Sequence, residues 1–325
     1  MEFHNREKEI EGLMRIIKSE PTLITFIYGP INSGKTALIK KVIEDLPKDY
    51  VAFYINLRER MIKDYRDFIQ ELFETFDVKE NLLLDLLEET TKFMGIPISR
   101  NLLEKIFSRD KPGDAFKYIV NLTRKLKDSG RTPIIVLDEL QKIKDIKING
   151  YLLYELFNLF ISLTKENHSA HVFAITSDSL FIERVFRETK LYGRARYFLV
   201  DDFDYKTTEE FLRKHGFSSE EIELTWKYFG GKPVFLIEAI NNKDNIKEFC
   251  ASQLSLRKRQ IKEIIKGRNF KILKEFKGKE EVIVEEIDEE IEYLVENNIL
   301  FFDPVRGILK PQSRLDLLAI REIVP

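Results

Sequence analysis

Several features are scarce in this sequence of 325 residues, and each absence excludes a class of protein. The single cysteine, Cys250, excludes an internal disulfide and favours a reducing compartment in which the thiol is buried as a small apolar group. Only 14 glycines and 10 prolines exclude a collagen-like or low-complexity chain. No run of 18 apolar residues without a charge occurs, and the first 13 residues lack the apolar stretch of a signal peptide. These absences predict a folded, soluble, cytoplasmic protein without a membrane partner.

The sequence also lacks an excess of charge of one sign, although charged residues are abundant. The 53 Lys and Arg residues nearly balance the 55 Asp and Glu residues, so the net charge is −2 and no global field points to a nucleic-acid partner. Charged residues make up 33% of the chain, against about 25% in average globular proteins, and there are only five glutamines. This combination favours the surface ion-pair networks of a protein from a thermophile.

Five short apolar runs alternate with helical patterns. Residues 22–28 form a β-rich run that ends at Gly29, and a helical stretch at residues 35–46 then leads to a second β-rich run. In chain order, the five runs are 22–28, 51–57, 133–137, 171–175 and 197–200. Nearly continuous apolar strands separated by helices indicate a parallel sheet covered on both faces, which is an α/β fold.

The rest of the chain has a different texture. Residues 58–130 carry helical patterns and read as a helical insertion in the α/β core, which would span residues 1–203. Helical segments continue through residues 204–250. Residues 251–325 contain two helical segments at 261–276 and 285–297, followed by a hairpin at 299–310, a pattern that resembles a winged helix.

The segment Gly29 to Thr36 matches the phosphate-loop pattern G-x-x-x-x-G-K-[ST]. A strand before it and a helix after it are what the pattern requires, because inward-facing backbone N–H groups and the positive helix end bind phosphate. Lys35 would reach the β- and γ-phosphates and Thr36 would bind Mg²⁺. The residues expected to contact nucleotide here are Gly29, Pro30, Ile31, Asn32, Ser33, Gly34, Lys35, Thr36 and Ala37.

Two acidic residues follow the third strand. Asp138 would hold Mg²⁺, and Glu139 would polarise the attacking water as general base. Together with the phosphate loop they predict an enzyme that hydrolyses the phosphoric anhydride of a nucleotide, and not only a nucleotide-binding protein.

Two further sites each have two interpretations. Ser177 follows the fourth strand, where it could face the γ-phosphate as a sensor residue, or the run Thr176 to Asp178 could simply cap a helix. Arg194 precedes the fifth strand, where it could aim its guanidinium at transition-state charge or lie in a basic loop paired with acids.

Taken together, these motifs resemble the archaeal ATPase family in the STAND branch of the AAA+-related P-loop ATPases. The segments that carry the resemblance are residues 3–9, 29–36, 136–141, 191–195 and 230–233. The resemblance implies ATP or ADP and Mg²⁺ as ligands, a five-stranded sheet of order 5-1-4-3-2, a helical lid at residues 204–250 and a winged helix. It further implies that Phe3 and Arg6 lie near the adenine and that Pro233 approaches the nucleotide from the lid.

The expected function is Mg²⁺-dependent ATP binding and hydrolysis that drives a conformational switch. The alternative is a nucleotide-gated DNA-binding protein related to the origin-recognition initiators. Residues 257–274 carry eight basic residues against Glu263, a net charge of +7, whereas residues 285–296 carry seven acids and no Lys or Arg. The acidic segment is the expected reading helix and would be repelled by phosphate. The basic segment could contact a phosphate backbone with another face, or the two segments could neutralise each other. We therefore expect a protein partner or an intramolecular role rather than DNA.

Overall fold

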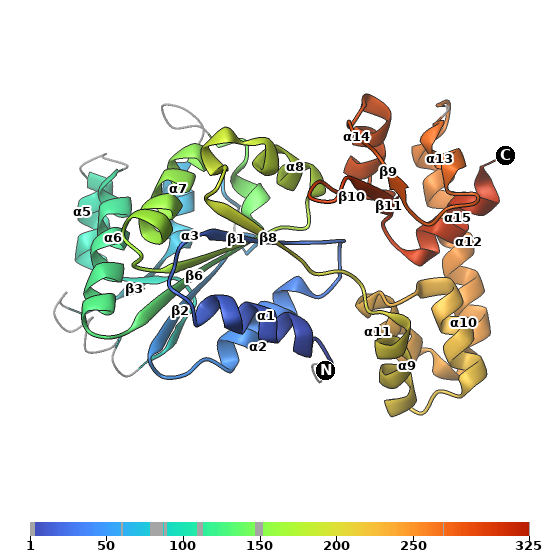
Figure 1. Ribbon diagram of the computed structural model, residues 1–325, viewed down its shortest axis with the longest axis horizontal. Coiled ribbons are helices and arrows are strands. Elements are labelled where there is room, and N and C mark those ends of the chain that lie inside the picture. The colour runs from blue at the N-terminus through green and yellow to red at the C-terminus, as the bar shows by residue number, and fades with distance from the viewer. Residues whose placement is uncertain are drawn as a thin grey trace.

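The computed structural model describes residues 4–59, 61–78, 87, 90–108, 113–146, 152–268 and 270–324. Figure 1 shows two lobes side by side: an N-terminal lobe built on a sheet, and a mostly helical C-terminal lobe. None of the helices in these ranges is long and apolar enough to cross a membrane.

A six-stranded parallel sheet forms the centre of the N-terminal lobe, in the order β4-β2-β6-β7-β1-β8. The strands are β1 (Ile24–Tyr28), β2 (Tyr50–Asn56), β4 (Lys92–Phe93), β6 (Thr132–Asp138), β7 (His171–Ile175) and β8 (Ala195–Leu199). Every residue of β1 and β7 is buried. The sequence predicted five strands, and β4 is an additional edge strand that pairs with β2.

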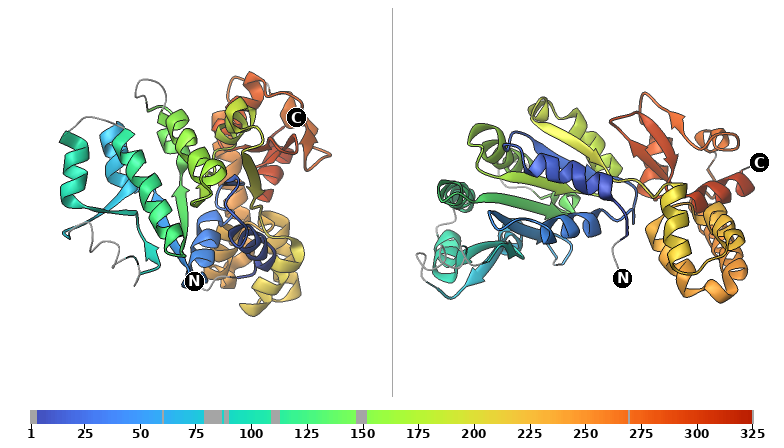
Figure 2. Two further views of the ribbon diagram at one scale, coloured as in Figure 1. Left: turned by 60° about the vertical axis from the view of Figure 1, so that its left-hand side comes forward. Right: turned by 60° about the horizontal axis from the view of Figure 1, so that its bottom comes forward.

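Helices cover both faces of this sheet, as Figures 1 and 2 show. Alternate strand residues separate two cores: Ile134 and Val136 pack in a cluster with α1 and α2, whereas Ile135 and Leu137 pack with the helices of the other face. The first face has α1 (Glu7–Ile17) and α2 (Lys35–Glu44). The second has α3 (Tyr65–Leu72), α5 (Arg100–Ser108), α6 (Gly113–Asp128), α7 (Leu152–Ile161) and α8 (Ser179–Arg187). Three short turns, η1 (Leu140–Ile143), η2 (Ser162–Glu166) and η3 (Thr189–Leu191), complete this lobe.

The segment 58–130 is not purely helical, so that part of the sequence prediction was wrong. In addition to β4, it contains the parallel pair β3 (Phe73–Phe76) and β5 (Ile96–Ser99). Phe73 continues the helical spacing of α3, yet its backbone is extended, because β3 pairs with a segment about 20 residues away. Gly95 allows this pairing: it has a φ of 147°, and a Cβ there would lie 2.9 Å from the Glu74 nitrogen. Strands of four residues are too short to show an alternating pattern.

The C-terminal lobe begins with helices joined by short turns. They are α9 (Tyr205–Lys214), α10 (Ser219–Phe229), α11 (Pro233–Asn241), η4 (Lys243–Asn245) and α12 (Ile246–Ile264). Asp204 caps α9, and Ser218 with Glu221 forms a capping box on α10. The expected boundary at residue 250 falls inside α12, where Cys250 is fully buried as predicted. One hydrophobic cluster includes Phe229, Phe276 and Ile320, so both sides of that boundary share a core.

A small antiparallel sheet ends the chain, in the order β10-β11-β9. The elements that follow α12 are α13 (Ile272–Glu275), β9 (Val282–Ile283), α14 (Glu289–Glu296), β10 (Leu300–Asp303), β11 (Ile308–Pro311) and α15 (Arg314–Ile323). The sequence analysis missed α15, although Ser313 caps it by accepting the Asp316 N–H at 3.2 Å. It also extended one helix through residue 276, whereas α12 ends at Ile264 and a turn separates it from α13.

His171 is a buried titratable group at the start of β7. It is 3% exposed, and burial lowers its pKa to about 4. An unfolded histidine has a pKa of about 6.5. Between these two values the unfolded chain binds a proton that the folded protein does not, so stability falls as the pH drops from about 6.5 to 4.

We predict that His171→Gln will make the protein less sensitive to acid. This histidine should cost the native protein about 2–3 kcal/mol of unfolding free energy between pH 7 and pH 4.5, and the variant should not lose that share. Urea denaturation of both proteins at the two pH values measures the difference, since their carboxylates titrate alike. Equal losses in the two proteins would contradict the buried, neutral ring.

Candidate functional site

The phosphate loop lies at the carboxyl end of β1, as the sequence predicted. Gly29, Asn32 and Gly34 have φ values of 153°, 60° and 91°, so the loop needs residues that tolerate positive φ. A Cβ on Gly29 would lie 2.1 Å from the Val200 carbonyl oxygen, which only glycine avoids. The loop is therefore held against the end of β8, and α2 begins at Lys35 with Ala37 exposed in its first turn.

Lys35 points back into this loop. Its Nζ donates to the carbonyl oxygens of Gly29 at 3.0 Å and Pro30 at 2.8 Å, and the side chain is 5% exposed. The Lys35 pKa is lowered to about 8, with burial as the largest cause and the charge of Lys232 as the second. Two buried ammonium groups near one loop form an environment that an anion such as phosphate would stabilise.

Thr36 and Asp138 meet although their strands are not adjacent. The Thr36 hydroxyl donates to Asp138 Oδ2 at 2.7 Å, and the Tyr54 hydroxyl donates to the same oxygen at 2.8 Å. Burial and the nearby Asp138 raise the Tyr54 pKa well above its usual range, so Tyr54 remains a donor. The hydroxyl and carboxylate are oxygen ligands of the kind Mg²⁺ prefers. No group of three or more His, Cys, Asp or Glu side chains suited to a metal occurs among the described residues, so this pair fits Mg²⁺ that is shared with phosphate oxygens.

Glu139 is held by two partners on both carboxylate oxygens. Arg58 Nη2 donates to Oε1 at 2.6 Å, and Gln141 Nε2 donates to Oε2 at 2.7 Å. Glu139 has a φ of 64°, a strained value for a non-glycine residue. The sequence analysis missed Arg58. Asn56 at the end of β2 lies in register with Asp138 at the end of β6. The position of Arg58 just after β2 could therefore have indicated that it lies close to Glu139.

A cavity of about 440 Å³ is lined by several of the residues that the sequence predicted to act at the site. Ile31 and Asn32 of the loop, Glu139 and Ser177 all line it. Asp178 also caps α8 by accepting the Phe181 N–H at 2.9 Å. Both interpretations of the segment 176–178 therefore have structural support, the cap from Asp178 and the cavity position from Ser177.

The structure places the two predicted arginines at opposite ends of the sheet. Arg6 Nη2 donates to the carbonyl oxygens of Ser33 at 2.7 Å and Asp201 at 2.6 Å, so it supports the phosphate loop. Arg194 is at the amino end: its carbonyl oxygen accepts the Ile24 N–H at 2.9 Å. A five-residue strand spans roughly 15 Å, so Arg194 is not brought to the loop of its own chain.

Of the two remaining predictions, Phe3 lies outside the described residues. Pro233 is the first residue of α11.

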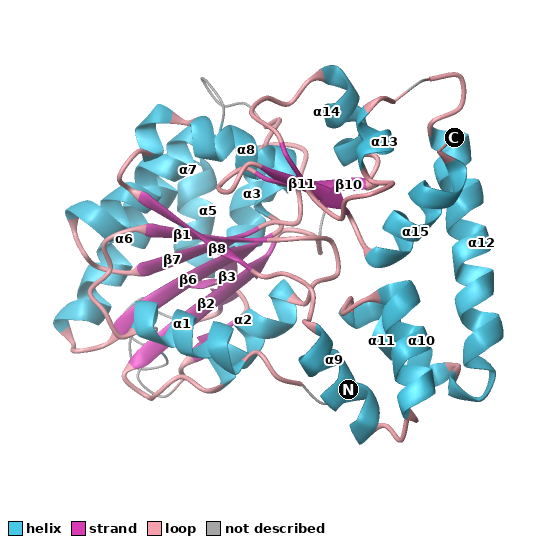
Figure 3. Ribbon diagram, turned by 45° about the vertical axis from the view of Figure 1, so that its right-hand side comes forward, coloured by secondary structure: helices cyan, strands magenta, loops and turns pink. Residues whose placement is uncertain are grey.

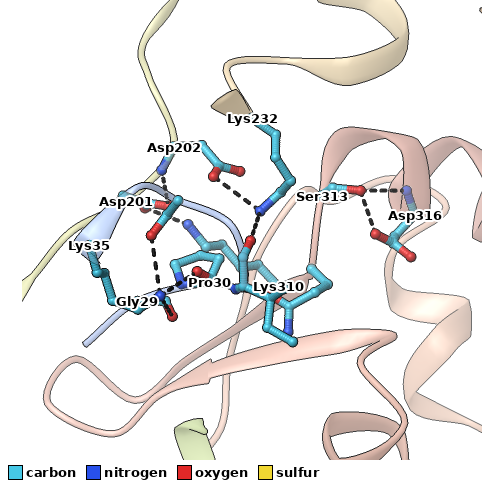
Figure 4. A network of polar contacts seen from close by, with 12 residues as sticks. Gly29, Pro30, Lys35, Asp201, Asp202, Lys232, Lys310, Ser313 and Asp316 are labelled. Atoms are coloured by element: carbon cyan, nitrogen blue, oxygen red, sulfur yellow. Dashed lines mark hydrogen bonds and ion pairs between the residues drawn. The ribbon is translucent and has the colours of Figure 1, made fainter. Parts of the chain in front are cut away.

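The C-terminal lobe holds the tip of the loop through Ile31. Figure 4 shows the Lys232 side chain of this lobe directed at Asp202 beside the loop. Lys232 Nζ donates to the Ile31 carbonyl oxygen at 2.9 Å and forms an ion pair with Asp202 at 3.1 Å. The Ile31 N–H donates to Gln312 Oε1 at 3.1 Å. Gly231 permits this approach, since a Cβ there would lie 1.8 Å from the Phe203 carbonyl oxygen.

Two further contacts dock the same lobe beside the loop. Lys310 pairs with Asp201 at 2.5 Å, and the Tyr28 hydroxyl donates to Asp303 Oδ1 at 2.8 Å. Sequence reasoning missed these two contacts, because each joins residues more than 100 positions apart and no local pattern marks them.

Two family patterns cover the chain. The pattern described as "ATPase domain predominantly from Archaea" matches residues 3–239. The pattern of the C-terminal domain of "Uncharacterized ATP-binding protein MJ1010-like" matches residues 236–324.

The similarity extends over the full length of individual proteins. An uncharacterized ATP-binding protein of Pyrococcus abyssi is 52% identical over 98% of this chain and 98% of its own length. Another from Methanocaldococcus jannaschii is 49% identical over 100% and 98% of the two chains.

Solved structures show a related fold. A Walker-type ATPase of Pyrococcus abyssi matches with a TM-score of 0.67 at 18% identity, over 98% of this chain and 96% of its own. The Aeropyrum pernix ORC2 protein in its ADPNP–ADP complexes matches with a TM-score of 0.54 at 13% identity, over 99% and 94% of the chains. With the family pattern spanning residues 3–239 and relatives about half identical over the whole length, the chain belongs to the family of ATPase domains found predominantly in Archaea.

Proposed function

We propose that this protein binds ATP with Mg²⁺ at the phosphate loop and hydrolyses it. The observation that carries the proposal is the 2.7 Å hydrogen bond between Thr36 and Asp138, with Lys35 and Glu139 beside these two residues. This arrangement brings a phosphate-binding ammonium group, two metal-binding oxygens and a carboxylate base to one edge of the sheet. The family membership and the ATP-binding names of the relatives support it.

Each residue would have a separate task in the reaction. Lys35 would leave the carbonyl oxygens of Gly29 and Pro30 and bind the β- and γ-phosphates. Thr36 and Asp138 would hold Mg²⁺, which when bound offsets negative charge on the phosphates. Glu139 would accept a proton from the water that attacks the γ-phosphate, while the bond from the γ-phosphate to the β-phosphate oxygen breaks and ADP leaves. Ser177 would face the γ-phosphate from the cavity.

Glu139 is held in place in the arrangement described here, although each carboxylate oxygen keeps a further lone pair. Both of its oxygens accept hydrogen bonds, from Arg58 at 2.6 Å and from Gln141 at 2.7 Å. We propose that this is a resting arrangement and that nucleotide binding frees Glu139. Arg58 is 65% exposed, so moving it away from the carboxylate buries no charge.

The same site is proposed to drive a conformational switch. Lys232 and Gln312 hold Ile31 by its carbonyl oxygen and its N–H, and Lys232 is 3% exposed. Bound phosphates would attract Lys232 away from Asp202 and the loop carbonyl, which loosens the docked C-terminal lobe. We further propose that α9 to α11 form a lid that brings Pro233 to the nucleotide, with Arg6 on the adenine side. The final unit, a three-stranded sheet with α14 between β9 and β10, would be a winged-helix variant.

One prediction of this proposal separates ATP binding from ATP hydrolysis. Lys35→Ala removes charge-assisted hydrogen bonds of about 1.5–3 kcal/mol and should weaken ATP binding roughly 10- to 150-fold. Glu139→Gln should keep ATP affinity within about threefold but lower the hydrolysis rate at least 100-fold, since general-base catalysis contributes about 10²–10⁴. Calorimetry measures the binding and phosphate release measures the rate. Hydrolysis by Glu139→Gln at the native rate would remove Glu139 from the mechanism.

The second prediction concerns the contact between the two lobes. Gln312→Ala removes the acceptor of the Ile31 N–H, so the amide protons of residues 29–33 should exchange faster with solvent in the nucleotide-free protein. A nonhydrolysable ATP analogue should increase exchange at residues 300–313 of the native protein. Gln253→Ala, which alters the neighbouring cavity but not this hydrogen bond, is the matched control. Unchanged exchange at residues 300–313 on adding the analogue would argue against the switch.

A further inference from the structure

The segment from Arg259 to Lys279 carries a concentrated positive charge. It has eight basic residues against Glu263 and Glu275, a net charge of +6 in a chain whose total is −2. All eight of these basic side chains are exposed, and Lys266 and Lys279 pair with Glu263 and Glu275. The other six are called the basic face here: Arg259, Lys262, Arg268, Lys271, Lys274 and Lys277.

The described part of the chain provides no ion-pair partner for the basic face. Other basic residues of the same helix are paired: Arg257 contacts Asp316 at 2.6 Å and Lys258 contacts Glu322 at 2.6 Å. The neutralisation by the acidic segment that the sequence left open does not occur among these residues. The acidic helix α14 contacts elements on two sides: Glu292 lies 3.8 Å from Arg184 of α8, and Glu290 Oε1 accepts the Ile272 N–H of α13 at 2.7 Å.

The basic face extends from α12 through α13 and is partly ordered by stacking. Arg259 and Lys262 lie three positions apart on α12, so they share one side of the helix. A turn at Gly267, with a φ of 73°, then leads into α13. The Arg268 guanidinium lies 3.9 Å from the ring centroid of Tyr293, which holds it beside α14. Figures 1 and 3 show α12 on the side of the C-terminal lobe that is away from the six-stranded sheet.

The composition of this surface fits a phosphate backbone better than a protein. Protein interfaces are depleted in lysine and depend on buried aromatic or apolar anchors. Among the described residues from 257 to 282, no large hydrophobic side chain is exposed, and Leu256 and Ile283 only flank the segment. Backbone binding to nucleic acid requires no apolar anchor, because its affinity comes from released counterions.

We infer that the basic face binds the sugar–phosphate backbone of nucleic acid without reading its sequence. The acidic α14 would be repelled from a groove, so the contact is made by α12 and α13 and positions the chain without base contacts. The inference is independent of ATP hydrolysis, since no residue of the basic face lies at the phosphate loop.

The test is a salt titration of the full-length chain with a fluorescent duplex of about 30 base pairs of arbitrary sequence. If six phosphates are contacted, the logarithm of the affinity should fall with the logarithm of salt with a slope of about −5 for the duplex, and about −4 for a single strand. Affinity for the duplex should therefore fall about 10³-fold between about 50 and 200 mM salt. Absence of binding to either nucleic acid at about 50 mM salt would overturn the inference.

The variant Arg259→Gln/Lys262→Gln/Lys274→Gln should make the duplex slope less steep by about 3. Its affinity for the duplex should then fall only about 40-fold over the same salt range. A second variant, Lys271→Gln/Lys277→Gln, should lower it by about 2, and both variants should melt at the native temperature because these side chains are exposed. Lys258→Gln is the matched control on the same helix, since Lys258 is already paired, and should keep the native slope. Native slopes in both variants, or binding to anionic lipid vesicles without binding to nucleic acid, would refute the assignment.

Discussion

The hydrogen bond between Thr36 and Asp138, 2.7 Å long, is the contact on which the rest of the site depends. Thr36 follows β1 and Asp138 ends β6, and β7 lies between these two strands, so the residues belong to strands about 10 Å apart. The parallel order brings both carboxyl ends to one edge, and α2 then carries Thr36 across the end of β7. The strands are apolar on both faces, so helices must cover both faces of the sheet. This produces two separate hydrophobic cores, one on each face, and the polar site lies at the carboxyl edge between them.

The second constraint is that the phosphate loop is shared between the lobes. Ile31 contacts Lys232 through its carbonyl oxygen and Gln312 through its N–H, so the loop cannot change its backbone without disturbing α11 and the segment after β11. The buried Lys232 is close enough to Lys35 to lower the Lys35 pKa. A phosphate group would therefore act on the local charge balance and on the docking of the C-terminal lobe at once, which is the physical basis of the proposed switch.

The sequence was sufficient for the parts of the fold and site that have a local signature. The loop from Gly29 to Thr36, the pair Asp138 and Glu139, and the five principal strands follow from motif spacing and apolar runs within a few residues. Arg58, Gln312 and the β3–β5 pair were not predictable in this way, because each depends on a partner distant in sequence. The acidic and basic segments were visible in the sequence. Only the structure shows that Glu292 of α14 pairs with Arg184, and that α14 contacts α13 without an ion pair to the basic face among the described residues.

A crystal structure of the protein with Mg²⁺ and a nonhydrolysable ATP analogue would test the central claim most directly. The account predicts that Lys35 Nζ leaves the carbonyl oxygens of Gly29 and Pro30 for the phosphates, that the Thr36 hydroxyl and the Asp138 carboxylate lie at the metal, and that Gln312 separates from Ile31. An analogue bound elsewhere, or bound at the loop with Lys35 and Gln312 in their present contacts, would contradict it.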